Sequence, residues 1–459
     1  MNRQHDIAAS GGPESLRRRV IGASAWSVGG FGISLVIRFG GNLLVTRLLA
    51  PEMFGIIAVA TVVMSTLTVL SDLGLKQSVV QNRRGGESTF LNTIWTIQIV
   101  RGAQLMLAAL AVAGLVAGTQ HYKLLPANSV YADDRVPYVV TIVSVTAIIS
   151  GLASTRILEA SRNLQIRRAV LIEIAAQVVG LALMLAWIAV DRSIWALVAG
   201  GIASATATTG LSHAILRGHR NRLEWDKSAA REVIRFGKWI LLGSIIGALI
   251  ANSDRLLLAG MIDSHLLGVY AIAFNIYIST EQLLMRVVSG TGYPAISEVV
   301  RNRPANLQTA YYKMHMVVAL VAYSSFGLLS VLGPRLIAFL YDARYSDAGW
   351  MLQILSVGLL LTPSQLALQT FLALNKPKIN TAISALRLLI ILGAMPAGFA
   401  ALGLPGALIG FVSSSAICIL VIAFFSARMH FFDWRRELIP LPAIALGMLA
   451  GKLSLLVLG

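Results

Sequence analysis

The residues of this sequence that could do chemistry are charged side chains inside long apolar stretches. Arg38, Arg101 and Arg387 stand deepest in such stretches, and none has an opposite charge three or four positions away. At the centre of a bilayer, each would cost about 2.5–3.5 kcal/mol if it faced lipid. We therefore expect these side chains to face a bundle interior or a water-filled cavity. Because an arginine fork suits phosphate oxygens, such a cavity would attract a phosphate-bearing anion.

Five further charges occur in similar stretches, and we assign them to the same cavity. Arg286 would add a fourth guanidinium. The remaining charges would balance or gate a bound anion, and they are Asp72, Lys76, Asp254 and Glu281. Structural alternatives stay open. Asp72 and Lys76 are four residues apart, so on one helix they could simply neutralise each other, and Arg286 is close enough to the end of its stretch to reach the interface.

The sequence carries no signature of a catalytic or metal site. It lacks the GxSxG, Walker A, HExxH and DxD-type patterns that mark nucleophiles, phosphate cradles and metal ligands. Its single cysteine, Cys418, lies in an apolar run, and no CxxC motif or His/Cys cluster is present. We therefore predict no catalytic residue, no metal and no cofactor, and a protein that is not an enzyme.

The apolar stretches that position these charges predict an all-α integral membrane protein. Of the 459 residues, 56% are hydrophobic and only 13% are charged, and the mean hydropathy is +0.74. A span needs roughly 20 mostly apolar residues at about 1.5 Å rise per residue. About thirteen segments meet this requirement. Their approximate ranges are 20–48, 54–80, 90–118, 138–160, 169–190, 193–216, 236–260, 264–292, 312–341, 347–373, 379–400, 404–427 and 439–458.

Basic residues are concentrated in alternate loops between these spans. The loops on the side of the N-terminus are basic, from Arg17 to Arg19 near the start through the run between Arg217 and Lys238, whereas the opposite loops carry few such residues. The positive-inside rule then places the N-terminus in the cytoplasm, and we expect a multi-pass protein of a bacterial inner membrane. The formal net charge of +17 is thus topological, and no nucleic-acid partner is expected.

The longest basic loop divides the chain into two parts. Residues 217–235 are predicted to form a cytoplasmic linker between a lobe of six spans at 20–216 and a second six-span lobe at 236–427. A cytoplasmic tail at 1–19 precedes the first lobe, and an extra helix within 428–459 follows the second. The final apolar run could instead be re-entrant or peripheral.

A short internal repeat suggests that the two lobes are duplicates. Arg47-Leu-Leu ends the first span and Arg255-Leu-Leu ends the seventh, and each is followed by a turn and an apolar-Gly pair that opens the next helix. These pairs are Phe54-Gly55 and Leu267-Gly268. A chance match stays open. A spacing of six helices is nevertheless what two lobes of the same orientation would produce.

Three stretches resemble one family, the polysaccharide (O-antigen and exopolysaccharide) flippases of Wzx type. The resemblance extends to the number of helices and the loop pattern along the whole chain. The stretches are Arg47-Leu-Leu-Ala-Pro-Glu-Met-Phe-Gly55 running on to Asp72-Leu-Gly-Leu75; Asn252-Ser-Asp-Arg-Leu-Leu-Leu258 with Leu267-Gly-Val-Tyr-Ala-Ile-Ala273; and Tyr293-Pro-Ala-Ile-Ser297 with Tyr311-Tyr-Lys313.

This resemblance implies the two-lobed fold of the multidrug/oligosaccharidyl-lipid/polysaccharide (MOP) exporter superfamily, which includes the multidrug and toxin extrusion (MATE) proteins. It also implies alternating-access transfer of an undecaprenyl-diphosphate-linked oligosaccharide. The hypothesis drawn from the buried charges then assigns the binding of its diphosphate to Arg38, Arg101, Arg286 and Arg387. Energy would come from an ion gradient or from the membrane potential. Other membrane proteins of polysaccharide assembly would be partners. Such proteins usually have twelve or fourteen helices, so a count of thirteen is a departure that concerns the C-terminal region.

Three alternatives remain beside this interpretation. An ion-coupled drug or metabolite antiporter on the same fold would favour acidic residues in its first lobe, but here Arg38, Lys76 and Arg101 outnumber Asp72. A membrane-embedded enzyme of glycan assembly would be expected to have a large external loop, which this chain lacks. A scaffold that has lost transport activity is compatible with the same residues.

Overall fold

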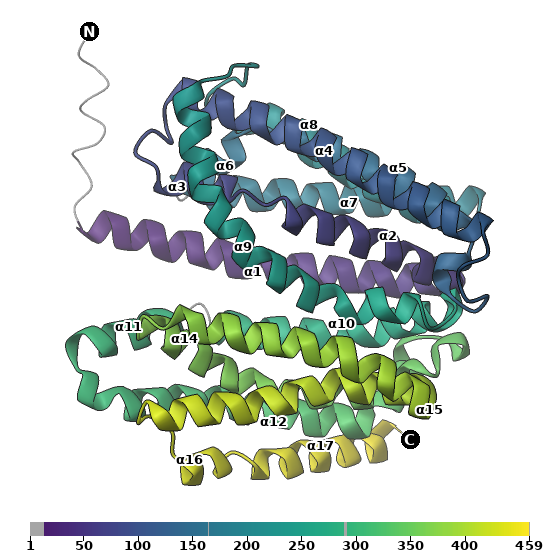
Figure 1. Cartoon of the computed structure of the whole chain (residues 1–459), viewed down its shortest axis with the longest axis vertical. Helices are drawn as coiled ribbons and strands as arrows, with labels where there is room; N and C mark the ends of the chain where they lie inside the picture. The colour runs from purple at the N-terminus through teal and green to yellow at the C-terminus, as the bar shows by residue number, and fades with distance from the viewer. Residues whose placement is uncertain (1–12, 164, 289–291, 459) are drawn as a thin grey trace. The chain divides into compact units, whose positions relative to one another are not determined.

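All the regular secondary structure of the described chain is helical. A computed structural model describes residues 13–163, 165–288 and 292–458, with no strand among them (Figure 1). Some helical residues are described by their backbone alone, and Arg286 is one of these. The predicted all-α class is therefore confirmed over the described ranges.

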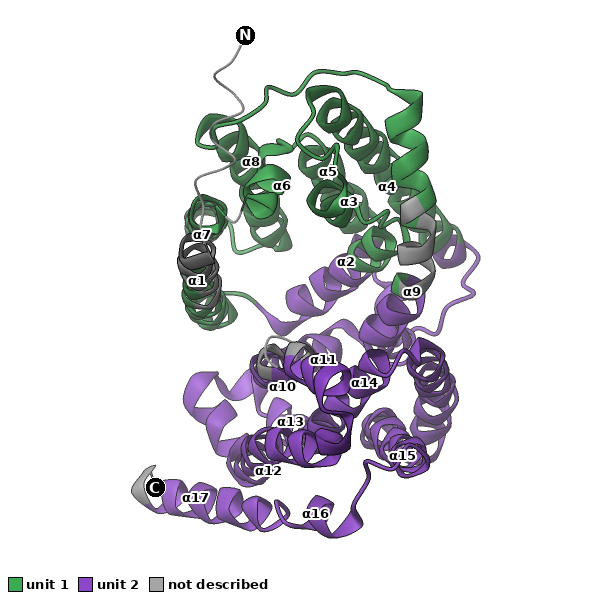
Figure 2. Cartoon of the chain, turned by 90° about the vertical axis from the view of Figure 1, so that its left-hand side faces the viewer, with its two compact units in different colours: residues 1–49, 63–118, 137–244 green, residues 50–62, 119–136, 245–459 purple. Residues whose placement is uncertain are grey.

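Contacts divide the chain into two compact units (Figure 2). Unit 1 comprises Met1–Leu49, Val63–Gly118 and Pro137–Ser244. It contains all or part of the helices α1 (Pro13–Leu48), α2 (Pro51–Leu70), α3 (Leu75–Gln81), α4 (Ser88–His121), α5 (Arg135–Gly151), α6 (Arg156–Arg162), α7 (Ile166–Val190), α8 (Ile194–Ala214) and α9 (Lys227–Ala259).

Unit 2 comprises Ala50–Val62, Thr119–Val136 and Ile245–Gly459, so it includes the start of α2 and the end of α9. Its other helices are α10 (Ser264–Val287), α11 (Tyr293–Asn302), α12 (Leu307–Leu340), α13 (Ala348–Ser356), α14 (Gln365–Ala373), α15 (Pro377–Arg428), α16 (Trp434–Leu438) and α17 (Pro442–Leu458). Short 3-10 segments lie at Val130–Ala132, Pro304–Asn306, Ala343–Tyr345 and Val357–Ser364.

A helix lies at each of the thirteen predicted spans. Within the described ranges, nine helices are long and apolar enough to cross a membrane, or ten when the bent pair α5 and α6 counts as one span. One of the nine, α15, contains two helices joined at Gly403, where φ is 66°. α9 and α10, with 33 and 24 residues, are also long enough to cross. The chain is thus an integral membrane protein.

The predicted second span is interrupted, which corrects one expectation. α2 ends at Leu70 and α3 begins at Leu75. Between them Gly74 adopts φ 62°, a left-handed conformation that favours glycine, and its N–H donates to Asp72 Oδ1 at 3.0 Å. Asp72 and Lys76 therefore do not share a helix, and the alternative that they pair as helical neighbours is wrong.

The span predicted at 138–160 is also broken. α5 and α6 meet at an angle of 61°. The connecting backbone is anchored by polar side chains of unit 1, because the Ser154 N–H donates to Ser212 Oγ at 2.9 Å and the Ser154 hydroxyl donates to Asn221 Oδ1 at 2.8 Å. An apolar window cannot reveal such a bend, because the bend depends on partners that lie far away in the sequence.

The C-terminal helix α17 packs closely on α12. A Cβ on Gly327 would overlap the carbonyl oxygen of Ile444, and a Cβ on Gly447 would overlap that of Ser324. This reciprocal contact brings two backbones together, as small residues allow between membrane helices. The last apolar segment is therefore a packed helix of unit 2, and Figure 2 shows it beside α12.

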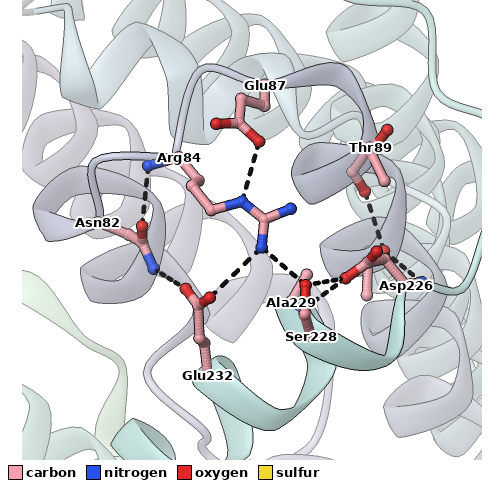
Figure 3. Close-up of polar contacts among 9 residues, drawn as sticks. Asn82, Arg84, Glu87, Thr89, Asp226, Ser228, Ala229 and Glu232 are labelled. Atoms are coloured by element: carbon pink, nitrogen blue, oxygen red, sulfur yellow. Dashed lines mark hydrogen bonds and ion pairs between the residues drawn. The ribbon is translucent and has the colours of Figure 1, made fainter.

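The predicted linker is attached to unit 1 by a polar network (Figure 3). Arg84 donates to Glu87 Oε2 at 2.9 Å, to Ser228 Oγ at 2.9 Å and to Glu232 Oε1 at 3.3 Å. Asn82 Nδ2 donates to Glu232 Oε2 at 2.8 Å. Residues 227–235 of the linker form the first turns of α9, so this network joins the loop before α4 to the start of α9.

Asp226 caps the N-terminus of α9, and we predict a small but measurable contribution to stability. Its Oδ1 accepts hydrogen bonds from the Ser228 hydroxyl at 2.5 Å and from the Ala229 N–H at 2.6 Å. We expect Asp226→Ala to lower the Tm in detergent by about 1–3 °C. Fluorescence-detected size-exclusion chromatography after heating would measure this change in Tm. Asp226→Asn keeps the acceptor and serves as the control, and an unchanged Tm for the alanine variant would contradict the prediction.

The same cap also has a defined dependence on pH. The hydrogen bond from Ser228, together with that from the Ala229 N–H, lowers the pKa of Asp226. A lowered pKa in the folded state means that the stabilisation is present above the ordinary aspartate pKa of about 3.9 and is lost as the pH falls below it. The difference in Tm between wild type and Asp226→Ala should therefore shrink in acid.

Candidate functional site

In unit 1, Arg101 is held at the end of α2. Its Nε donates to the Ser71 hydroxyl at 3.0 Å, and a terminal nitrogen donates to the Thr68 carbonyl at 2.6 Å. Asp72 lies close enough to interact electrostatically with the same guanidinium. The Ser71 hydroxyl also donates to the Thr68 carbonyl at 3.1 Å, so Arg101 joins a local hydrogen-bond network at the end of α2. The structure brings together two of the predicted site residues, Arg101 and Asp72.

In unit 2, Asp254 lies near the end of α9 with 1% of its surface exposed. Its Oδ2 accepts a hydrogen bond from the Tyr270 hydroxyl at 2.5 Å, and Arg255 Nε lies 3.8 Å from the same oxygen. The guanidinium of Arg255 lies 4.7 Å from the ring centroid of Phe274. Asp254 Oδ1 is buried and has no hydrogen-bond partner among the described residues, so this carboxylate keeps a spare acceptor.

A second cluster in unit 2 joins α10 to α15. The Tyr277 hydroxyl donates to the carboxylate of Glu281, and Arg387 on α15 interacts electrostatically with that carboxylate. Tyr277 is 3% exposed, and a Cβ on Gly358 would approach its hydroxyl oxygen to 2.7 Å. Arg387 Nε is buried without a hydrogen-bond partner within the part of the chain that the structure describes. Glu281 and Arg387, which are far apart in the sequence, are therefore neighbours.

The two clusters are connected by one face of α10, which we call the α10 stripe. It consists of Tyr270, Phe274, Tyr277 and Glu281, whose spacings of four, three and four residues place them on one side of a helix. The ring centroids of Tyr270 and Phe274 are 5.7 Å apart, and those of Phe274 and Tyr277 are 5.8 Å apart. Asp254 contacts one end of the stripe and Arg387 the other.

The charged groups of these clusters are suited to binding a proton or an anion inside the membrane. Paired charges inside a membrane protein mark ion and substrate pathways, because lipid-facing charges are costly. The spare oxygen of Asp254 can accept a proton or a donor, and the free Nε–H of Arg387 can donate to an anionic oxygen. Over the described ranges, no group of three His, Cys, Asp or Glu side chains is placed to hold a metal ion.

The remaining predicted residues are placed individually. Arg38 is exposed on α1 and Lys76 is exposed on α3. The side chain of Arg286 lies outside the described residues. Because Arg38 and Arg101 belong to unit 1 and Arg387 belongs to unit 2, the grouping of all four arginines around one cavity stays a prediction.

Sequence reasoning missed the partners of these charges. Tyr277 precedes Glu281 by four residues, so a search for polar neighbours one helical turn away would have found it. Asp254 is on α9, whereas Tyr270 is on α10, after the turn that joins the two helices. Ser71 directly follows α2, whereas Arg101 is on α4. No spacing rule relates those pairs, because helix packing alone brings them together.

The sequence matches a known family over most of its length. Residues 44–349 match the model of the family described as "Polysaccharide biosynthesis protein". The chain is similar to "Lipopolysaccharide biosynthesis protein WzxC" of Escherichia coli K12, with 22% identity over 352 residues that cover 75% of this chain and 67% of the relative. It is also 19% identical, over 90% of its length and 83% of the relative, to an "Uncharacterized membrane protein in cps region" of Klebsiella pneumoniae.

Solved structures show the same fold. The lipid II flippase MurJ in an inward closed conformation superposes with a TM-score of 0.66 at 12% identity, covering 94% of this chain and 98% of that one. An inward-facing multidrug transporter of the MATE family superposes with a TM-score of 0.65 at 14% identity, covering 86% and 94%. The predicted fold of MOP type is therefore confirmed.

Proposed function

This chain belongs to the polysaccharide biosynthesis protein family, and on that premise we propose that it is a flippase for a lipid-linked glycan. Its substrate would be an undecaprenyl-diphosphate-linked oligosaccharide, moved from the cytoplasmic to the periplasmic leaflet by alternating access for export of a cell-surface polysaccharide. The names of two similar proteins support this proposal, since one is a lipopolysaccharide biosynthesis protein and the other a lipid II flippase.

The observation that carries the proposal is the guanidinium of Arg387. It lies inside an apolar helix and has a buried Nε–H without a partner among the described residues. An arginine keeps its charge under all physiological conditions, and its fork matches phosphate oxygens. A membrane protein that retains such a donor is equipped to receive an anionic group, and the diphosphate of a polyprenyl carrier is an anion that lies in the membrane.

The charge of the loops and of the lipid headgroup supports a proposed orientation of the protein in the membrane and a proposed energy source for transport. The basic loops favour a cytoplasmic N-terminus in the inner membrane. A membrane potential that is negative inside would drive an anionic headgroup outward, at about 2.3 kcal/mol per charge for each 100 mV. Asp254 and Glu281 would then couple or gate the movement. Other membrane proteins of polysaccharide assembly would receive the product.

Lipid analysis in a strain without this gene tests the function directly. We expect undecaprenyl-diphosphate oligosaccharide to accumulate severalfold in lipid extracts measured by mass spectrometry. Wild type should clear the glycolipid, whereas Arg101→Ala should not, because the end of α2 and Asp72 would lose their partner. Lys452→Ala, an exposed position on α17, is the matched control and should clear it.

One result would replace the proposal with another function. If no lipid-linked glycan accumulates and sensitivity to cationic drugs rises in the deletion strain, the chain is an antiporter on the same fold. Membrane expression of each variant must be equal, so immunoblotting of the membrane fraction accompanies the lipid analysis.

A further inference from the structure

Unit 1 contains a basic pocket that the clusters described above do not include. Its volume is about 650 Å³, and it lies where α6, the start of α7 and the segment after α8 meet. The charged side chains that line it are Arg156, Glu159, Arg167, Arg168 and Arg217. Four guanidiniums against one carboxylate give the pocket a strong positive field, which favours an anion.

The arginines of this pocket have different roles. Arg156 is structural, because it donates to the carbonyls of His213, Leu216 and His219. Arg167 lies over the ring of Trp26, with 5.0 Å between the guanidinium carbon and the ring centroid. Arg167, Arg168 and Arg217 are all exposed, and because Arg167 lies over a ring, we take Arg168 and Arg217 as the side chains that reach a ligand.

The backbone of α7 adds to the same positive field. The helix begins at Ile166 next to the pocket, and no side chain caps its N-terminus. Free N–H groups and the helix dipole at such an end bind phosphate. The cavity, the exposed arginines and the open helix end therefore point to one ligand chemistry, a phosphate or diphosphate.

An apolar groove lies farther along the same helices. Its volume is about 660 Å³, and only a small part of its lining is polar. Side chains of α5, α7 and α8 form it, including Ile142, Val179, Leu183, Trp187, Trp195 and Ala203. The α7 side chains among these are more than 40% exposed, so the groove is open to a hydrocarbon chain.

Helix geometry places the pocket and the groove on one face of α7. Arg168, Val179 and Leu183 are separated by eleven and fifteen residues, close to three and four turns at about 3.6 residues per turn. The groove therefore begins about 16 Å along the axis from Arg168, and Trp187 lies about 28 Å from it. An acyl chain that fills half of a hydrocarbon core of about 30 Å would end where the groove begins.

We propose that this face of unit 1 binds the polyprenyl carrier before transfer, with the diphosphate in the basic pocket and the polyprenyl chain in the apolar groove. The proposal rests on the proposed function, because it names a docking site for the same lipid. A polyprenyl diphosphate fits both features at once. A membrane phospholipid supplies the phosphate, but its chains are too short to fill the groove.

Binding to the purified full-length protein, measured by native mass spectrometry, tests the proposal apart from transport. The probes are undecaprenyl diphosphate without sugar, geranyl diphosphate and phosphatidylglycerol. We expect wild type to prefer the first probe, and the double variant Arg168→Ala/Arg217→Ala to bind it about tenfold more weakly or worse. Ala203→Trp should fill the groove and weaken the long-chain probe only. Arg192→Ala, an exposed arginine after the opposite end of α7, is the control.

Two results would overturn the site. Phosphatidylglycerol that competes as well as undecaprenyl diphosphate would show a general anionic-lipid surface. Equal binding by wild type and the double variant would show that the carrier binds elsewhere. Either failure leaves the flippase function intact if wild type still clears accumulated glycolipid from the deletion strain, so the two proposals are separable.

Discussion

Gly268→Val is expected to abolish clearance of lipid-linked glycan, whereas Gly393→Val is expected to leave it close to wild type. Both glycines lie inside helices of unit 2. A Cβ on Gly268 would overlap the carbonyl oxygen of Pro51, while a Cβ on Gly393 would meet no atom within 4 Å. The two variants therefore add the same side chain in opposite surroundings.

The contact at Gly268 is one half of a reciprocal arrangement between α2 and α10. A Cβ on Gly55 would overlap the carbonyl oxygen of Ser264, and Ser264 precedes Gly268 by the same four residues by which Pro51 precedes Gly55. Backbone atoms cannot move aside as the end of a flexible side chain can. Valine must therefore separate the helices, at a cost of about 1–3 kcal/mol or more.

The measurement combines clearance in the deletion strain with Tm in detergent. Gly268→Val and Gly55→Val should fail in the same way, because each disturbs the same crossing. Normal clearance by either valine variant would show that the close approach of α2 and α10 is dispensable. If Gly393→Val also failed to clear the glycolipid, a larger side chain in any membrane helix would be enough to abolish clearance. The close contact between α2 and α10 would then not be the cause of the loss.

The crossing of α2 and α10 explains why both copies of the sequence repeat contain a glycine. The apolar-Gly pairs at Phe54-Gly55 and Leu267-Gly268 were recognisable because they recur one six-helix unit apart. Their position predicts two equivalent helix starts. It does not predict that the starts touch, since contact depends on how the helices cross. The reciprocal overlap with Pro51 and Ser264 is therefore visible only in the structure.

The helices could be predicted better than their interruptions. Hydrophobic length located thirteen segments, and each contains a described helix, because the cost of exposing backbone in lipid requires long helices. The break at Asp72 and Gly74 escaped prediction although Ser71, Asp72 and Lys76 make this stretch more polar than the rest of the span, because the apolar residues on either side were joined into one segment. A left-handed glycine and one side-chain hydrogen bond create it, and hydropathy reports neither the backbone angle nor the bond.

The candidate site could be predicted one residue at a time, but its pairings could not. The cost of burying charge identified Arg101, Asp254, Glu281 and Arg387 as residues that need an explanation. Their partners are tyrosine hydroxyls, a serine hydroxyl and a carbonyl. Such groups are common in membrane helices, so their role becomes apparent only when packing brings them near a charge.

Arg387→Ala is expected to destabilise the protein and abolish clearance, for two separable reasons. Removing the guanidinium leaves the Glu281 carboxylate beside α15 without its counter-charge. Removing one partner of a fully buried ion pair costs about 3–5 kcal/mol, and because Glu281 is only partly buried and interacts with Arg387 through its charge rather than through a described ion pair, we expect about 1–2 kcal/mol. The second reason is the loss of the donor that we propose for the diphosphate.

The double variant Glu281→Gln/Arg387→Met separates these two effects. It removes both charges and keeps the side-chain volumes similar, so the fold should recover most of its stability. Clearance should remain lost, because methionine cannot donate to phosphate. Arg387→Lys keeps the charge but not the planar fork, and an intermediate rate of clearance is expected.

Thermal unfolding in detergent and clearance of glycolipid are measured for each of these variants. A double variant that is stable and inactive would assign Arg387 to the ligand. A double variant that is stable and active would show that the guanidinium serves only to balance Glu281, and the diphosphate site would then have to be sought elsewhere. The recovery of stability without clearance is therefore the result on which the proposed role of Arg387 depends.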